Sequence, residues 1–234
     1  MLRSFIRRTA VPRFAAPRLS TPVTPLRTPS PLFNAARGFS SKPEGARAQT
    51  SSAAGNGIRT TNEDFKGRYM LIYFGFTNCP DICPEELDKM AEVLDTVKAD
   101  PQIGDVITPI FITCDPQRDT VAEVNEYVKD FHKDLIGLTG SLEEIARVAK
   151  SYRVYFSKPP KVNPGEDYLV DHSIFFYLMA PDGSFVDCYA KDHTAEFVSQ
   201  SVKDHIAKFK EEGGQVLPKL SEKRLSESSA SASA

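Results

Sequence analysis

The segment YMLIYFGFTNCPDICPEELDKM, residues 69–90, is the most informative part of this chain for predicting its fold. Its first eight residues, 69–76, are almost all apolar and rich in aromatic side chains, which is typical of a strand buried on both faces. Asn78 and Pro80 end that strand in a polar loop. Pro84 suits the first position of a helix, because the N–H group that proline lacks would have no partner there. Apolar residues then recur at helical spacing, so the segment predicts a strand, a loop and a helix.

Two cysteines, Cys79 and Cys83, lie in this loop with the spacing C-x-x-x-C, one residue longer than the redox motif of thioredoxins. At the start of a helix, backbone N–H groups and the helix dipole favour the thiolate over the thiol. A dithiol held there can cycle to a disulfide or offer two soft thiolates to a metal ion. A purely structural role is disfavoured, because the loop is polar and interrupted by proline. The spacing alone leaves redox and metal chemistry both open.

Strand and helix patterns alternate along the rest of the chain. The predicted elements are a strand at residues 106–113, helices that begin after the capping boxes at Thr120 and Ser141, strands at 152–156, 173–179 and 184–189, and a last helix at 194–210. This alternation favours an α/β sheet that contains parallel strands. The order fits a thioredoxin-like fold, with a central mixed sheet flanked by helices.

The composition indicates one folded domain between two segments of different character. Residues 1–41 contain seven arginines and no acidic residue, which is typical of a mitochondrial transit peptide. Residues 42–62 are rich in Ala, Gly, Ser and Thr and predict a flexible linker. We expect residues 63–212 to form the domain and residues 213–234 to form a disordered, low-complexity tail.

The distribution of charge argues against one class of partner. The chain has 29 basic and 31 acidic residues, and seven of the basic ones lie in residues 1–41, so the remainder carries a formal charge of −9. Nucleic-acid affinity comes largely from Lys and Arg contacts to phosphate, so we expect no nucleic-acid partner. Four cysteines are too few for a disulfide scaffold. Cys114 and Cys188 are expected to be buried free cysteines on strands.

The stretch FGFTNCPDICPEEL, residues 74–87, resembles the signature of the Sco/SenC family, mitochondrial and bacterial proteins that deliver copper to cytochrome c oxidase. Three further stretches match in the same order, namely TCDPQRDT at 113–120, DYLVDHSIFFY at 167–177 and APDG at 180–183. The resemblance extends from about Phe65 to Phe209. The combination is specific, whereas a C-x-x-x-C motif alone would be a weak signal.

The resemblance implies a metal site made of Cys79, Cys83 and His172, because His172 matches the family's third ligand. Two thiolates and one imidazole form a soft site that suits Cu(I), although Cu(II) stays open. Zinc usually takes a fourth protein ligand in structural sites. Asp171 is expected either to orient His172 or to cap the loop before it. Asp115 and Arg118 are expected to be mainly structural, with the rim of the dithiol site as the alternative.

The function that the resemblance implies is that of a copper metallochaperone rather than an enzyme. It would deliver one copper ion to the binuclear copper site of cytochrome c oxidase subunit II during complex IV assembly. A small soluble copper chaperone of the intermembrane space would supply the ion, and a homodimer stays open. The alternative is a thiol–disulfide reductase that keeps the target's copper-binding cysteines reduced. A thioredoxin-like peroxidase is a weaker third hypothesis, because no motif for holding a peroxide is present.

The expected location follows from the same two signals. The arginine-rich start predicts mitochondrial import, and the resemblance implies an inner-membrane protein that faces the intermembrane space. Family members carry a membrane helix after the presequence and then a short hairpin. The chain has no run of about 18 apolar residues, and TTNEDFKG at 60–67 matches only the end of that hairpin. We therefore expect the sequence to be an incomplete version of an anchored protein.

Overall fold

The computed structural model describes residues 52–54, 58–159 and 167–220. The predicted transit peptide, most of the predicted linker, residues 160–166 of the polar loop before His172 and residues 221–234 of the predicted tail lie outside these ranges. Within the described ranges, no helix is both long enough and apolar enough to cross a membrane.

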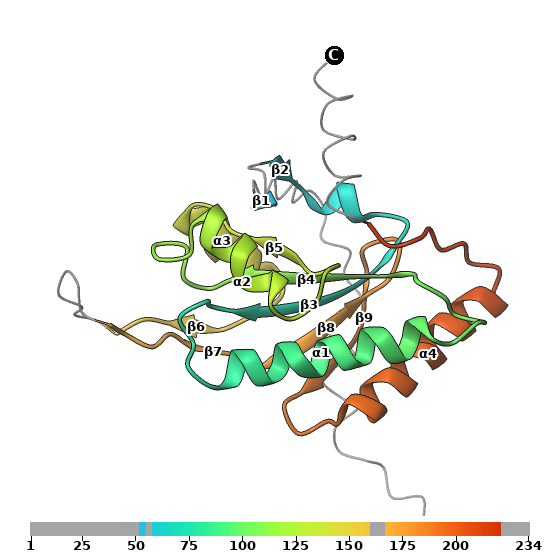
Figure 1. Cartoon of the computed structure of the whole chain (residues 1–234). Helices are drawn as coiled ribbons and strands as arrows, with labels where there is room; N and C mark the ends of the chain where they lie inside the picture. The colour runs from blue at the N-terminus through green and yellow to red at the C-terminus, as the bar shows by residue number, and fades with distance from the viewer. Residues whose placement is uncertain (1–51, 55–57, 160–166, 221–234) are drawn as a thin grey trace, which may run out of the picture. The chain divides into compact units, whose positions relative to one another are not determined.

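A five-stranded mixed sheet forms the centre of the described domain (Figure 1). Its spatial order is β5 (Ile136–Leu138), β4 (Ile107–Thr113), β3 (Tyr69–Gly75), β8 (Phe175–Met179) and β9 (Phe185–Ala190). The central strand β3 runs parallel to β4 and antiparallel to β8. All seven residues of β3 and of β4 are buried, as expected for strands covered on both faces.

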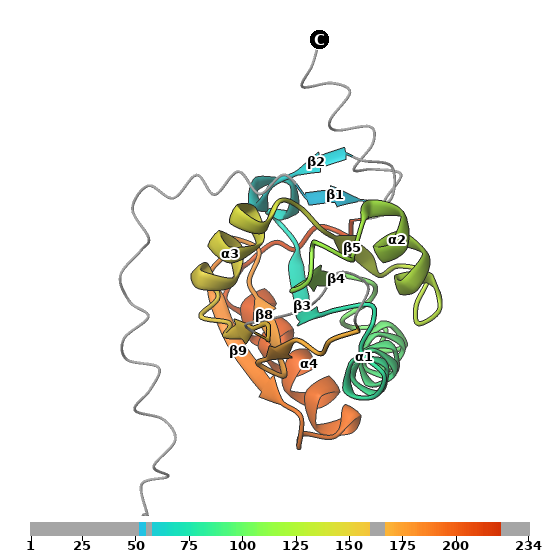
Figure 2. The ribbon, with the colours of Figure 1, turned by 90° about the vertical axis from the view of Figure 1, so that its left-hand side faces the viewer.

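Four helices flank this sheet, namely α1 (Ile82–Lys98), α2 (Val121–Lys129), α3 (Leu142–Ser151) and α4 (Ala195–Glu211). Figures 1 and 2 show α1 and α4 side by side on one face, α3 on the other face and α2 next to the edge strand β5. Both predicted capping boxes are present, since Thr120 and Ser141 each accept a hydrogen bond from the backbone N–H three residues later. The predicted thioredoxin-like fold, a mixed sheet flanked by helices, is confirmed.

Helix α1 begins earlier than predicted. Asp81 is its N-cap and Ile82 its first residue, so Pro84 is the third helical position rather than the first. Proline is tolerated there because the first four N–H groups of a helix have no intrahelical partner in any case. As a consequence, Cys83 lies inside the first helical turn, whereas Cys79 lies in the loop before it.

Two details of the strand prediction differ from the structure. Strand β5 was not predicted, because it has only three residues and a central glycine. Gly137 is required there, since a Cβ atom would lie 2.5 Å from Val124 Cγ1 of α2. The strand predicted at 152–156 is instead the end of α3 and a turn at Arg153, whose φ is 56°. The strand itself, β6, is Phe156–Ser157, and it pairs antiparallel with β7 (Asp171–His172).

The described residues of the predicted linker and of the predicted tail form backbone hydrogen bonds. In the predicted linker, β1 (Ser52–Ala54) pairs antiparallel with β2 (Ile58–Thr60). In the predicted tail, the Leu217 N–H donates to the Gly67 carbonyl at 2.7 Å, and Leu220 is buried in the core. These contacts hold the described residues up to 220 on the domain, because the Leu217 backbone is hydrogen-bonded and the Leu220 side chain adds apolar surface that the core covers.

Candidate metal centre

The two cysteines lie at the junction of β3 and α1. The Cys83 N–H donates to Cys79 Sγ at 3.5 Å, so the first turn of the helix directs a backbone donor at the loop sulfur. Both residues are buried, with 8% of Cys79 and none of Cys83 exposed. Gly75 leaves room for the second thiol, since a Cβ atom on Gly75 would lie 3.0 Å from Cys83 Sγ. The junction therefore holds a compact, protected dithiol.

The sheet brings His172 to the same place. Strands β3 and β8 are antiparallel neighbours, so residues that precede β8 lie beside residues that follow β3. His172 lies just before β8, and its Nε2 is 3.5 Å from Cys83 Sγ. Its Nδ1 is 3.1 Å from the Ser173 carbonyl, which can only accept a hydrogen bond. In the neutral ring this contact places the proton on Nδ1, and the lone pair of Nε2 then faces the sulfur, as a metal ligand needs.

The three predicted donors are close together but do not form a closed site. Among the residues that the structure describes, no group of three or more His, Cys, Asp or Glu side chains is arranged to hold a metal ion. Cys83 contacts both Cys79 and His172, and its sulfur also accepts a hydrogen bond from the Tyr73 hydroxyl at 3.6 Å. The donor set of two sulfurs and one imidazole nitrogen nevertheless fits a soft ion.

The two thiols differ in acidity. The contact with Cys83 is the largest influence on Cys79, and with the backbone N–H groups of the first helical turn and nearby His172 it lowers the pKa of Cys79 to about 5. Burial opposes this shift but is outweighed. The contact with Cys79 and burial both raise the pKa of Cys83. At neutral pH the metal-free site therefore contains one thiolate, Cys79, beside one thiol, Cys83.

This difference predicts the order of alkylation by iodoacetamide. Thiolate is the reactive form, so Cys79 should react at a constant rate above about pH 6 and lose reactivity as the pH falls through about 5. Cys188 is the internal control, because desolvation and Asp187 raise its pKa and its rate should still be rising above pH 9. Cys83 should stay unmodified in the folded protein. Peptide mass spectrometry measures all three, and equal rates for Cys79 and Cys188 at pH 6 would contradict the assignment.

The structure also places Asp171, Cys114 and Cys188. Asp171 is exposed, and the polar contact on His172 Nδ1 comes from the Ser173 carbonyl rather than from Asp171. Cys114 is buried at the end of β4, as predicted, whereas Cys188 is exposed on β9, so the prediction that it is buried is wrong. Residue alternation on an edge strand explains this, because every second side chain of β9 faces away from the core.

Sequence reasoning missed one residue of the site, Tyr73. The side chains at residues 69–74 are apolar except for the hydroxyl groups of Tyr69 and Tyr73. A buried tyrosine usually finds a hydrogen-bond partner for its hydroxyl. That signal marks Tyr73 as a residue to examine, but it does not say which partner. The partner is the Cys83 sulfur, ten residues later.

The chain is therefore a thioredoxin-like protein that carries a buried dithiol and a histidine at one end of its sheet. The sequence model of the SCO1/SenC family matches residues 48–207, and the chain belongs to that family. The resemblance that the cysteine segment suggested is thereby confirmed.

Relatives and solved structures agree with this membership. Protein sco1 of Schizosaccharomyces pombe is 53% identical over 148 residues, 63% of this chain and 56% of that protein. Protein SCO1, mitochondrial, of Saccharomyces cerevisiae is 48% identical over 153 residues, 65% of this chain and 51% of that protein. The crystal structure of Arabidopsis thaliana ScoI with copper bound is 47% identical with a TM-score of 0.63, and the match covers 68% of this chain and 96% of that one. The chain spans about half the length of the curated relatives it matches.

Proposed function

We propose that this protein is a copper chaperone that holds one copper ion through Cys79, Cys83 and His172. The observation that carries the proposal is the 3.5 Å approach of His172 Nε2 to Cys83 Sγ, beside a second sulfur held by the same helix. Structures of relatives at 47% identity, Arabidopsis thaliana ScoI and yeast Sco1, were solved with copper bound. Thiolate and imidazole donors favour Cu(I) over hard cations, and three ligands rather than four leave the ion free to exchange.

The proposed role is delivery of this copper to the binuclear site of cytochrome c oxidase subunit II by ligand exchange. Membership of the SCO1/SenC family and the similarity to Sco1 proteins of two yeasts support a role in cytochrome c oxidase assembly. The Saccharomyces cerevisiae relative named above is a mitochondrial protein. Residues 1–41 contain no acidic residue, which supports a role of this segment as a transit peptide. We place the domain in the intermembrane space, with a small soluble chaperone as its copper donor.

Copper titration of the reduced protein tests the site. With Cu(I) supplied from a competing chelator, binding should saturate at about one equivalent. His172→Ala should weaken affinity by more than the roughly 10–100-fold that loss of an outer-sphere partner costs. His205→Ala is the matched control, since His205 is partly exposed on α4 and contacts Asp187 instead. Equal affinity of His172→Ala and the wild-type protein would refute the three-ligand site.

A second candidate function, thiol–disulfide reduction, is favoured by the unequal acidity of the two cysteines. Cys79 as thiolate can attack a disulfide of a target protein, and Cys83 can then resolve the mixed disulfide. Reduction of the target needs no metal ligand, so His172→Ala should retain it. Loss of reductase activity together with copper binding in His172→Ala would contradict a reductase that works without the metal ligand.

A further inference from the structure

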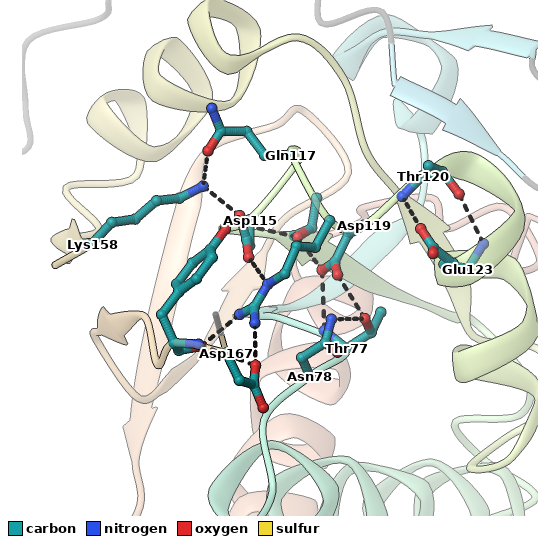
Figure 3. Close-up of polar contacts among 12 residues, drawn as sticks. Thr77, Asn78, Asp115, Gln117, Asp119, Thr120, Glu123, Lys158 and Asp167 are labelled. Carbon is teal, nitrogen blue, oxygen red and sulfur yellow. Dashed lines mark hydrogen bonds and ion pairs between the residues drawn. The ribbon is translucent and has the colours of Figure 1, made fainter. Parts of the chain in front are cut away.

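The segment between β4 and α2, residues 114–120, is hydrogen-bonded to the loop that carries the dithiol. Asp119, a fully buried carboxylate, accepts hydrogen bonds from the Thr77 N–H at 3.0 Å and from Thr77 Oγ1 at 2.6 Å. It also accepts one from Thr113 Oγ1 at the end of β4, at 2.5 Å. Figure 3 shows Asp119 directed at Thr77. Because Thr77 is two residues before Cys79, these bonds fix the dithiol loop to β4.

The same segment also contacts the hairpin that carries His172, through a hydrogen bond and an ion pair. Asp115, also fully buried, accepts a hydrogen bond from the Tyr168 hydroxyl at 2.9 Å and forms an ion pair with Lys158. Lys158 directly follows β6, and Tyr168 lies three residues before β7. One buried carboxylate therefore holds both strands of the β6–β7 hairpin, as the bonds converging on Asp115 in Figure 3 illustrate.

Arg118 connects the two sets of contacts. Its Nε donates to Asp115 Oδ2 at 2.6 Å, its Nη1 to Asp167 Oδ1 at 2.6 Å and its Nη2 to the Tyr168 carbonyl at 2.7 Å. Its guanidinium also lies over the Tyr168 ring, 3.7 Å from the centroid. This arrangement uses the planar fork of arginine, with donors on three nitrogens and a flat face for stacking, which a lysine cannot reproduce.

The hairpin needs such support. Its ladder has only two residue pairs, Phe156 with His172 and Ser157 with Asp171. So short a two-stranded ladder does not hold its position by its own hydrogen bonds. The Phe76 ring connects Arg118 with His172, since its centroid lies 5.9 Å from the guanidinium and 5.8 Å from the centroid of the imidazole.

We propose that Arg118, anchored on Asp115, is a positioning residue that holds His172 at the dithiol by fixing the β6–β7 hairpin. Asp119 holds the dithiol loop to the same segment, so residues 115–119 set the distance between the sulfur and nitrogen donors. This proposal rests on the proposed copper site and assigns to the TCDPQRDT stretch a role in forming it.

The first experiment compares Arg118→Met with Lys219→Met in Cu(I) competition. The two residues are matched, since each is a largely buried cation paired with two acidic residues, and Lys219 contacts Asp105 and Asp134 at the other end of β4. Arg118→Met should weaken Cu(I) binding about 10–100-fold, and Arg118→Lys should recover little of this. Lys219→Met should stay within about twofold of wild type. Equal effects of the two Met variants would overturn the proposal.

A double-mutant cycle then asks whether Arg118 acts through His172. In the His172→Ala background, Arg118→Met should change Cu(I) affinity less than about twofold, because the ligand that it positions is already absent. If the same 10–100-fold loss persists in that background, Arg118 does not act through His172 and the proposal fails.

A metal-free readout separates this proposal from the copper function. In the ¹H–¹⁵N spectrum of imidazole groups, wild-type His172 should keep its Nδ1 proton in the bond to the Ser173 carbonyl. Arg118→Met should shift and broaden that signal, while Lys219→Met leaves it unchanged. If the wild-type protein fails to bind copper but this difference is seen, the proposed function is wrong and the positioning role stands. An unchanged His172 signal in Arg118→Met would refute positioning whatever the copper result.

Discussion

Replacing Asp119 with alanine should lower the free energy of unfolding by about 3 kcal/mol, because the variant leaves buried donors without an acceptor. Asp119 is fully buried and accepts hydrogen bonds from the Thr77 N–H, the Thr77 hydroxyl and the Thr113 hydroxyl. Urea denaturation followed by far-UV circular dichroism gives the free energy directly. The dithiol loop should also become more accessible, so alkylation of Cys79 and Cys83 should accelerate in the variant.

Two further variants test whether the loss of stability in Asp119→Ala comes from the buried hydrogen bonds of Asp119. Asp119→Asn keeps one carbonyl oxygen as an acceptor and should cost about half as much. Asp192→Ala removes a carboxylate with 87% of its side chain exposed and should change stability by less than about 0.5 kcal/mol. If Asp119→Ala were no more destabilising than Asp192→Ala, the bonds to Thr77 would not hold the dithiol loop in place.

Oxidation of Cys79 and Cys83 to a disulfide should reduce copper binding from about one equivalent to none. The two thiolates are the proposed ligands, and the disulfide removes two electrons and both donors at once. The two residues are close to each other, because the backbone N–H of Cys83 donates to Cys79 Sγ at 3.5 Å. Peptide mapping after mild oxidation should recover the Cys79–Cys83 link, and a reductant should restore copper binding.

A Cys188→Ser variant is the control for this experiment, since Cys188 is exposed on β9 and should take no part. Its oxidation and copper loss should match those of the wild-type protein. Recovery of a Cys114–Cys188 link, or full copper binding by the oxidised protein, would show that the redox chemistry lies elsewhere than at the β3–α1 junction.

Local sequence was sufficient for several elements of the fold. The uninterrupted apolar run at 69–76 predicted a strand buried on both faces, and β3 is buried along its whole length. The capping boxes predicted the starts of α2 and α3, because their hydrogen bonds join residues only three apart. The dithiol was equally visible, since Cys79 and Cys83 lie within one loop and the first turn of the helix that follows it.

Local patterns in the chain are thus enough to predict the strand–dithiol–helix unit, the mixed α/β architecture and the acidity expected of a cysteine at a helix start. The contact between His172 and Cys83 depends on the three-dimensional fold, because those residues are 89 positions apart and are brought together by the antiparallel pairing of β3 with β8. It also decided that Asp115, Arg118 and Asp119 connect the two loops. The spacing of these three residues does not predict partners that are 40 to 50 residues away. Such contacts depend on the order of the strands in the sheet rather than on local propensity.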